Sequence, residues 1–298
     1  MDERSRPLVT VLMPTWNRAP FVAEAVASVL GQSYGALELV VVDDGSTDDT
    51  SDVLGAIRDQ RLRVIATPHR GIGAALNAAF AVASGDVVAR LDSDDLWLPT
   101  MVADQLAALV ARVDVDVVHA RSQVIDASGR RRDELWGRPL RVPDDPLLSL
   151  LYVDPICTIT AVYRRRLLDH VGPWPEHVQV GEDADLNLRV ALAGGRFLFR
   201  DAVVALNRRH PGNQSGDPTR FHAGRRAVLD AFYAHPHLPA RALAMRRLAY
   251  SNLDAEHGLH LRGARRWREA SAAFATAIAG APNPLRAAAR IAWLMMKS

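Results

Sequence analysis

Short apolar runs alternate with helical patterns along roughly the first 120 residues, and this alternation limits the possible folds most strongly. The runs are rich in β-branched residues, which favour strands, whereas the segments between them repeat apolar residues every three or four positions. Alternating strands and helices predict an α/β fold, with a mostly parallel Rossmann-like sheet and helices on both faces. The strands are expected at residues 8–13, 37–42, 62–65, 87–91 and 115–120, and the first helices at 21–30 and 74–84.

Acidic clusters stand where two of these strands end. Residues 92–95 read Asp-Ser-Asp-Asp, and Asp43 and Asp44 follow the second strand in the same way. Strand side chains alternate between faces, so Asp92 and Asp94 would point the same way and could share one hard cation. A nucleoside diphosphate needs such a cation, because side chains alone do not easily neutralise its phosphates. The alternative for each cluster is a solvated turn or a helix cap.

The first predicted strand ends in residues 14–17, Pro-Thr-Trp-Asn. Trp16 could stack on a nucleobase, although a lone tryptophan is more often packed in a core. The carboxylate of Asp44 could accept hydrogen bonds from a base or from ribose hydroxyls, with a capping turn as its alternative. Ligands of open parallel sheets bind beyond the carboxyl ends of the strands. The three strand ends together therefore predict one nucleotide site.

Composition narrows the setting of such a protein. The chain of 298 residues is long enough for one large core or for a catalytic domain with an appendage. It has no apolar stretch of about 18 residues that could span a bilayer, and residues 1–6 are not followed by the apolar core of a signal peptide. These features predict a cytoplasmic protein. The single Cys157 cannot form an internal disulfide and lacks metal-ligand spacing, so we expect a buried or partly buried side chain.

Five motifs, in this order and spacing, resemble those of the family 2 glycosyltransferases, which use the GT-A fold. They are residues 14–17, 43–48, 75–77 together with 84–86, 91–95 and 181–186. The resemblance covers about residues 8–215. It implies transfer of a sugar from a nucleotide-diphosphate sugar, with a UDP-sugar expected, to a hydroxyl of a saccharide or lipid-linked acceptor. It also implies inversion at the anomeric carbon and a role in cell-surface polysaccharide or glycoconjugate synthesis.

The resemblance implies roles for single residues. Trp16 matches the base-stacking position, and Asp44 matches the carboxylate that reads the base. Asp94 is similar to the main ligand of Mn²⁺ or Mg²⁺, and His210 lies where the family often has a histidine that closes over the diphosphate. A surface histidine flanked by arginines is the alternative for His210. The expected nucleotide-binding residues are Pro14, Thr15, Trp16, Asp43, Asp44, Arg70, Asp92 and Ser93, and the expected metal ligands are Asp94, Asp92 and His210.

Asp183 is similar to the family's general base, which removes the acceptor hydroxyl proton as the oxygen attacks the anomeric carbon. Base catalysis of this kind contributes about 100- to 10,000-fold. An acid in the first turn of a helix also stabilises the helix dipole, so a structural role for Asp183 is the alternative. Acceptor binding is expected at Glu182 and at Trp174, whose ring could stack on a sugar but could equally belong to the core.

A helical segment, residues 223–298, is expected to follow a catalytic domain of residues 1–222. Residues 221–298 contain 12 Lys and Arg but only 4 Asp and Glu, a net charge of +8, whereas the rest of the chain carries −6. Gly258, Phe274 and neighbouring apolar residues have the spacing of one tetratricopeptide-like hairpin. A single repeat cannot bury its own faces, so we expect it to pack on the catalytic domain or on neighbouring helices.

The basic end of the chain predicts a partner surface. Residues 285–297 form a short basic amphipathic pattern, and we expect peripheral contact with an anionic membrane, at the inner face of the plasma membrane, where a lipid-linked acceptor would lie. A helical bundle with solvated arginines is the alternative. We expect no nucleic-acid partner. The alternative function is a non-catalytic nucleotide-sugar-binding or scaffold partner of another glycosyltransferase, although the intact acidic motifs favour an enzyme.

Overall fold

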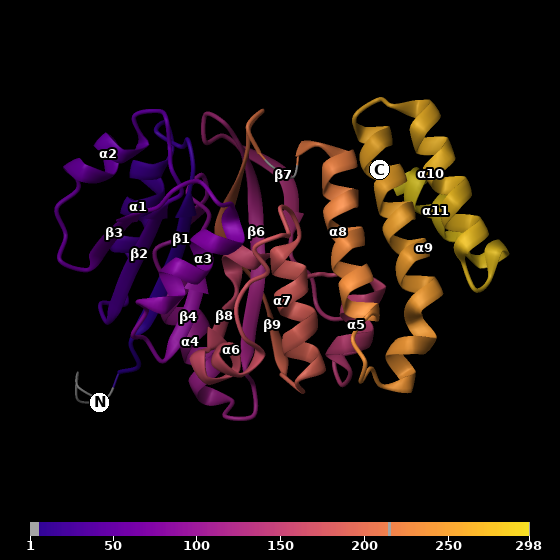
Figure 1. Cartoon of the computed structure of the whole chain (residues 1–298), viewed down its shortest axis with the longest axis horizontal. Helices are drawn as coiled ribbons and strands as arrows, with labels where there is room; N and C mark the ends of the chain where they lie inside the picture. Colours follow the sequence, from indigo (N-terminus) through magenta and orange to yellow (C-terminus); the bar gives the residue numbers. More distant parts are fainter. Residues whose placement is uncertain (1–5, 214–215, 298) are drawn as a thin grey trace. The chain divides into compact units, whose positions relative to one another are not determined.

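The computed structural model describes residues 6–213 and 216–297 (Figure 1). The chain divides into two compact units, each built from several segments. The first unit consists of Met1–Leu140, Pro155–Gln179 and Arg189–His210, and the second of Arg141–Asp154, Val180–Leu188 and Pro211–Ser298.

The first unit holds a nine-stranded mixed sheet. Its strands are β1 (Val9–Thr15), β2 (Leu37–Asp43), β3 (Leu62–Ala66), β4 (Val87–Arg90), β5 (Leu96–Trp97), β6 (Val117–Asp126), β7 (Arg131–Trp136), β8 (Val162–Arg164) and β9 (Phe197–Arg209). They lie in the order β3-β2-β1-β4-β8-β6-β9-β5, and β7 pairs with β6. The strands from β3 to β4 run parallel, as do β6 and β9, whereas β8 runs antiparallel to both β4 and β6. The predicted α/β class is confirmed.

Continuous apolar runs form the central strands of this sheet. Every residue of β1 and β4 is buried, as expected for strands that are covered on both faces. The predicted bounds of the first four strands agree with the observed ones to within two residues, and the fifth, β6, is longer than predicted. At Gly85, just before β4, a Cβ would lie 2.6 Å from the backbone nitrogen of Thr10, so this close approach requires glycine.

Helices connect the strands of the first unit and form most of the second. The first unit contains α1 (Val22–Leu30), α2 (Thr50–Ala56), α3 (Ile72–Ala81), α4 (Met101–Ala111), α6 (Arg165–Val171) and a 3-10 turn (Thr158–Thr160). Residues of α7 (Glu182–Leu192) belong to both units. The second unit also contains α5 (Pro146–Tyr152), α8 (Pro218–Tyr233), α9 (Ala240–Gly263), α10 (Trp267–Gly280) and α11 (Pro284–Lys297).

The long helix α9 is the centre of the second unit. It contacts α5, α8, α10 and α11, and Figure 1 shows α8 to α11 side by side. Gly258 of α9 lies against the Phe274 ring of α10, where a Cβ would be only 2.4 Å from the ring. The two helices therefore form a tight hairpin, at the positions that the tetratricopeptide-like spacing predicts. Ala255, Ala277 and Ile291 make a small core beneath it.

The domain boundary expected after residue 222 falls inside α8. The chain divides after His210 instead, and the second unit also includes the earlier segment Arg141–Asp154, because its helix α5 packs on α9. A contact between segments about a hundred residues apart leaves no mark in local composition.

Two observations bear on the expectations from composition. Within residues 6–213 and 216–297, no helix has the length and apolar character needed to cross a membrane. Cys157 is partly buried, and its Sγ lies 3.1 Å from the Ser122 hydroxyl.

Candidate active site

The carboxyl ends of β1 and β2 lie next to each other. Their parallel register pairs Thr15 with Asp43, and the amide of Asp44 donates to the Thr15 carbonyl at 2.9 Å. Pro14 and Thr15, the last two residues of β1, are buried. Asn17 has a φ of 52°, so the chain turns away from the sheet immediately after Trp16. The structure thus brings together the first two motifs that sequence reasoning assigned to the nucleotide.

Asn17 ties the loops after β1 and β2 to each other. Its backbone amide donates to the Ser46 hydroxyl at 2.9 Å, and its side-chain oxygen accepts from the Thr47 amide at 2.8 Å. Asp43 holds the second loop from inside, because one carboxylate oxygen accepts from the Ser46 amide at 3.0 Å and the other from the Ser51 hydroxyl. Asp43 therefore shapes the loop and is itself buried.

Asp44 organises the segment that follows β3. Its buried carboxylate accepts from the amides of Arg70 at 2.9 Å and Gly71 at 2.8 Å, and it lies 2.9 Å from Nδ1 of His69. Gly71 has a φ of 95°, a conformation that favours glycine. Both oxygens of Asp44 thus already have partners within the protein, which fixes the orientation of the carboxylate beside Trp16.

Trp16 presents an aromatic surface at this edge of the sheet. Its ring stacks on His69 with 4.7 Å between the ring centroids, and 41% of the residue is exposed. A large indole held against an imidazole loses few conformations when a second flat ring stacks on it. The geometry suits the base-stacking role that the resemblance implies.

Asp94 forms the centre of a second polar cluster. The same oxygen, Oδ2, lies 3.0 Å from Nε of Arg18 and 2.9 Å from Nε2 of His210. Burial acts to raise the pKa of Asp94, but the hydrogen bond from His210 and the charge of Arg18 outweigh it and hold that pKa below its usual range. The His210 side chain is only 7% exposed and packs on Phe21 with 4.7 Å between centroids, so the alternative of a surface histidine is wrong.

Asp92 and Asp94 do not share a strand face, which corrects the expectation from strand alternation. β4 ends at Arg90, and a turn follows in which the Asp95 amide donates to the Asp92 carbonyl at 3.0 Å. Asp92 pairs with Nε of Arg90 at 2.7 Å, and its side chain is 35% exposed, whereas Asp94 and Ser93 are buried. The turn gives the two carboxylates different partners.

Arg208, which sequence reasoning did not assign to the site, holds the acidic turn together with Asp95. The fully buried carboxyl of Asp95 accepts from the Arg208 amide at 2.6 Å and from the Asn207 side chain at 3.0 Å. Burial, together with the charges of the neighbouring carboxylates, raises the pKa of Asp95 well above its usual range. The buried guanidinium of Arg208 donates to the Asp94 carbonyl at 2.9 Å and pairs with Glu24 at 2.6 Å. These contacts fix the acidic turn against β9.

The carboxylates of the acidic turn, residues 92–95, are the candidates for a metal site. Carboxylate oxygens suit Mg²⁺ and Mn²⁺, and such ions commonly use one or two protein carboxylates together with substrate phosphates. Asp94 and His210 adjoin, but Asp92 is paired with Arg90. Among the residues that the structure describes, no three His, Cys, Asp or Glu side chains are grouped to hold a metal. Asp94 thus fits as an anchor for a cation that the substrate also binds.

The acidic pair after Gly181 lies in the second unit. Glu182 and Asp183 are the first two residues of α7, and Oδ1 of Asp183 accepts from the Ala184 amide at 2.8 Å. Glu182 is buried, whereas Asp183 is partly exposed. The position at a helix N-terminus agrees with the structural alternative for Asp183.

Trp174 and Arg70 differ in exposure. Trp174 is 5% exposed, packs edge-on against Phe80, and exchanges two hydrogen bonds with the Asn77 side chain through its backbone. The alternative in which Trp174 belongs to the core accounts for these contacts. Arg70 is largely exposed and pairs with Glu176 at 2.5 Å, so its guanidinium lies at the surface beside the loop that Asp44 holds.

Two solved structures share this fold. The chain matches a mannosyltransferase from Pyrobaculum calidifontis, solved with GDP-Man and Mn²⁺, over 98% of its own length and 80% of the other, with 24% identity and a TM-score of 0.65. It matches residues 1–349 of Staphylococcus aureus TarS, solved with UDP-GlcNAc, over 92% of its length and 82% of the other, with 22% identity and a TM-score of 0.65. The predicted GT-A fold is confirmed.

Sequence comparison gives the family. A model described as Glycosyl transferase family 2 matches residues 10–172, more than half of the chain. The protein therefore belongs to glycosyl transferase family 2. An uncharacterized glycosyltransferase of Nostoc sp. is 32% identical over 172 residues, which are 55% of this chain and 53% of that protein. The Escherichia coli glucosyltransferase WfaP, named for UDP-Glc and GlcNAc-diphosphoundecaprenol, is 36% identical over 100 residues, 33% of this chain and 40% of WfaP. The chain thus spans about half the length of these relatives or less.

Proposed function

We propose that this protein transfers a sugar from a UDP-sugar to a hydroxyl of a saccharide or lipid-linked acceptor, with inversion at the anomeric carbon. The observation that carries the proposal is the presence of two clusters at neighbouring strand ends: Trp16 and Asp44, which both contact His69, and Asp94 beside His210. Family membership supports the reaction class. The donors named for WfaP and TarS support a UDP-sugar as the donor. The GDP-Man bound to the Pyrobaculum enzyme makes a GDP-sugar the competing donor.

The donor end of the proposed site uses the loops of β1, β2 and β3. Trp16 stacks on the base, and the loop that Asp44 holds contacts the base and ribose. Arg70, on the same loop, is exposed and long enough to reach a phosphate. This division explains why the protein fixes Asp44 so firmly, because a preorganised loop loses little entropy when the nucleotide binds.

The leaving-group end uses the acidic turn. Asp94 and His210 would hold Mn²⁺ or Mg²⁺, which offsets the charge of the departing diphosphate. Arg18 lies on the same carboxylate and provides a further positive charge. Asp92 and Ser93 contact the ribose in this proposal.

Asp183 acts as the base. Its carboxylate takes the proton of the acceptor hydroxyl while that oxygen forms a bond to the anomeric carbon. The bond between this carbon and the diphosphate oxygen breaks, and its electron pair leaves with the nucleotide. A single displacement of this kind inverts the configuration. Glu182 lies next to Asp183 and contacts the acceptor.

The test is a screen of UDP- and GDP-sugars that measures nucleotide release. Each donor is tried with Mn²⁺, with Mg²⁺ and with a chelator, and with either water or a saccharide as the acceptor. Asp94→Asn should lower turnover about 100- to 1,000-fold, and Asp183→Asn about 100- to 10,000-fold with donor affinity retained. The control is Asp133→Asn, an exposed carboxylate of the first unit, which should behave as wild type.

Donor binding separates the enzyme from the alternative function. A protein that binds a nucleotide sugar by calorimetry but releases no nucleotide with any metal would be the non-catalytic partner. Trp16→Ala should weaken nucleotide binding by about 1–3 kcal/mol. Trp136→Ala is the matched control, because Trp136 is equally exposed, at 41%. Equal losses of nucleotide affinity in the two variants would show that Trp16 does not contact the nucleotide.

We further propose that α11 contacts an anionic membrane. Leu285, Trp293 and Met296 lie on one face of this helix and are 84%, 50% and 78% exposed. Arg286 flanks this face, and the segment from residue 221 carries a net charge of +8. An apolar stripe with flanking cations suits the interface of an anionic bilayer, where a lipid-linked acceptor resides.

A flotation assay tests this contact. The protein should float with vesicles containing phosphatidylglycerol, and less with pure phosphatidylcholine or at high salt. The double substitution Leu285→Ser with Met296→Ser should abolish flotation. Leu243→Ser, which changes an apolar residue of α9 that is 51% exposed, should not. Absence of flotation at low salt, or equal loss in both variants, would refute the proposal.

A further inference from the structure

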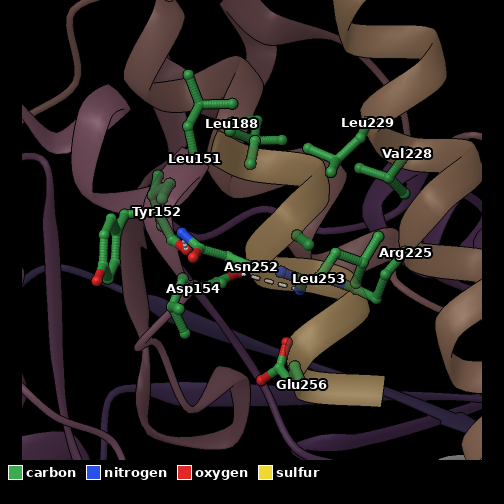
Figure 2. A pocket seen from close by; sticks show the side chains of 14 residues that line it. Leu151, Tyr152, Asp154, Leu188, Arg225, Val228, Leu229, Asn252, Leu253 and Glu256 are labelled. Atoms are coloured by element: carbon green, nitrogen blue, oxygen red, sulfur yellow. Dashed lines mark hydrogen bonds and ion pairs between the residues drawn. The ribbon is translucent and has the colours of Figure 1, made fainter. Parts of the chain in front are cut away.

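A small pocket lies among the helices of the second unit, next to the first turn of α7. Its walls come from α5, α7, α8 and α9, and Figure 2 shows Leu151, Leu188 and Leu229 above Asn252, with Asp154 and Glu256 below it. The cavity measures about 20 Å³, on the scale of one or two water molecules. The pocket is therefore too small for a sugar, and it marks the place where these helices meet.

The backbone of α8 touches the residues that lead into α7. A Cβ on Gly224 would lie 2.3 Å from the Val180 carbonyl oxygen, so only glycine allows this approach. Gly181 has a φ of 96°, and a Cβ there would lie 3.2 Å from Cδ of Arg225. The carbonyl of Gly181 accepts from the Asp185 amide at 3.0 Å, which begins the helix. The start of α7 is thus built directly on α8.

Arg225 is the only arginine among the described residues that line this pocket. Its Nη1 lies 3.5 Å from Oδ2 of Asp154, which also accepts from the Asn187 side chain of α7 at 3.4 Å. Burial acts to lower the pKa of Arg225, but the charges of Asp154, Glu256 and Asp183 raise it overall. The guanidinium is therefore a positive charge that Asp154 holds close to the start of α7.

We infer that Arg225 is a positioning residue for Asp183, and that α8 fixes the acidic first turn of α7. This inference rests on the proposed function, in which Asp183 is the base. A base must hold its carboxylate in one orientation, and misplacement by about 1 Å can lower the rate about 100-fold. A guanidinium that Asp154 holds in place, next to the residues that lead into α7, can supply this orientation. The helical segment then forms part of the catalytic machinery.

The first test compares Arg225→Met with Arg226→Met. Arg226 is the next residue on α8, is 49% exposed on its side chain, and lies 3.8 Å from Asp254, away from the pocket wall. Turnover is measured as UDP release from the donor found in the screen, with water as acceptor. Arg225→Met should lower kcat about 10- to 100-fold with the donor Kd unchanged, and Arg226→Met should change neither. Equal kcat in the two variants would overturn the inference.

Rescue distinguishes positioning from general damage to the fold. Arg225→Lys keeps the charge and should recover most of the lost kcat, with a thermal melt like that of wild type. Gly224→Ala should lower kcat in spite of the higher helix propensity of alanine, while Gly280→Ala, where a Cβ meets nothing within 4 Å, should not. A Lys variant as slow as the Met variant, or an active Gly224→Ala protein, would refute the role of α8.

Asp183→Asn separates this inference from the function on which it rests. Full activity of Asp183→Asn would refute Asp183 as the base and so the proposed mechanism. Loss of activity in Asp183→Asn with an unaffected Arg225→Met protein would refute only the positioning role. In the double variant, Arg225→Met should cause no further loss beyond that of Asp183→Asn, because residues that act as a unit are not additive.

Discussion

His119 should make the first unit less stable as the pH falls from 7.5 to 5. The residue lies on β6, is fully buried, and neither ring nitrogen has a hydrogen-bond partner among the described residues. Burial lowers the pKa of His119 from 6.5 to about 4. Below pH 6.5 the unfolded chain binds a proton that the folded protein excludes until about pH 4, so acid favours the unfolded state.

The size of the effect follows from these two pKa values. Between pH 7.5 and pH 5, His119 should lower the free energy of unfolding by about 2 kcal/mol, approaching about 3 kcal/mol at pH 4. Urea unfolding followed by tryptophan fluorescence at each pH measures this loss. His119→Leu, which has similar volume and no unsatisfied nitrogen, should show a correspondingly smaller loss and should be no less stable at pH 7.5.

His170 provides the control, because it is exposed on α6 of the same unit. His170→Leu should keep the pH dependence of wild type. Acid sensitivity that survives unchanged in His119→Leu would refute the reasoning, since it would mean that a group or water accepts a hydrogen bond from the protonated His119 ring and keeps its pKa from falling. The expected difference is well above the error of linear extrapolation when the two proteins are compared at the same pH.

Three further substitutions test the packing of the first unit. Gly85→Ala should destabilise by about 1–3 kcal/mol in urea, because its Cβ would lie 2.6 Å from a backbone nitrogen of β1, whereas Gly35→Ala, in open space, should be nearly neutral. Trp97→Phe should lower the free energy of unfolding by about 1–3 kcal/mol, since it leaves a buried carbonyl without its 2.6 Å hydrogen bond. Arg208→Met should lower the melting temperature clearly more than Arg209→Met, because only Arg208 is buried beneath the acidic turn.

The strands and their acidic ends were predictable because both signals are local. A buried parallel strand is a continuous apolar run, and the residue after it faces the ligand edge of the sheet whatever the rest of the chain does. This is why residues 14–17, 43–44 and 92–95 could be placed at one edge from sequence alone. The antiparallel strand β8, only three residues long, gave no comparable pattern.

The long-range contacts of the site were not predictable in this way. Arg208 meets the Asp94 carbonyl across 114 positions of sequence, and His210 meets the Asp94 side chain across 116. Arg208 appeared only as one of two adjacent arginines, and nothing local distinguishes the buried one from the exposed one.

Hydrogen-bond partners, more than motif membership, separate the acidic residues of this site. Asp43 has both oxygens committed to its own loop, Asp44 has both committed to the next loop, and Asp95 is held by β9. Among the described residues, Asp94 is paired with two side chains, those of Arg18 and His210, which can adjust their positions more readily than backbone amides. A cation entering with the diphosphate would therefore find its ligand at Asp94 before Asp43, Asp44 or Asp95, and this ranking follows from the partners that each carboxylate must give up.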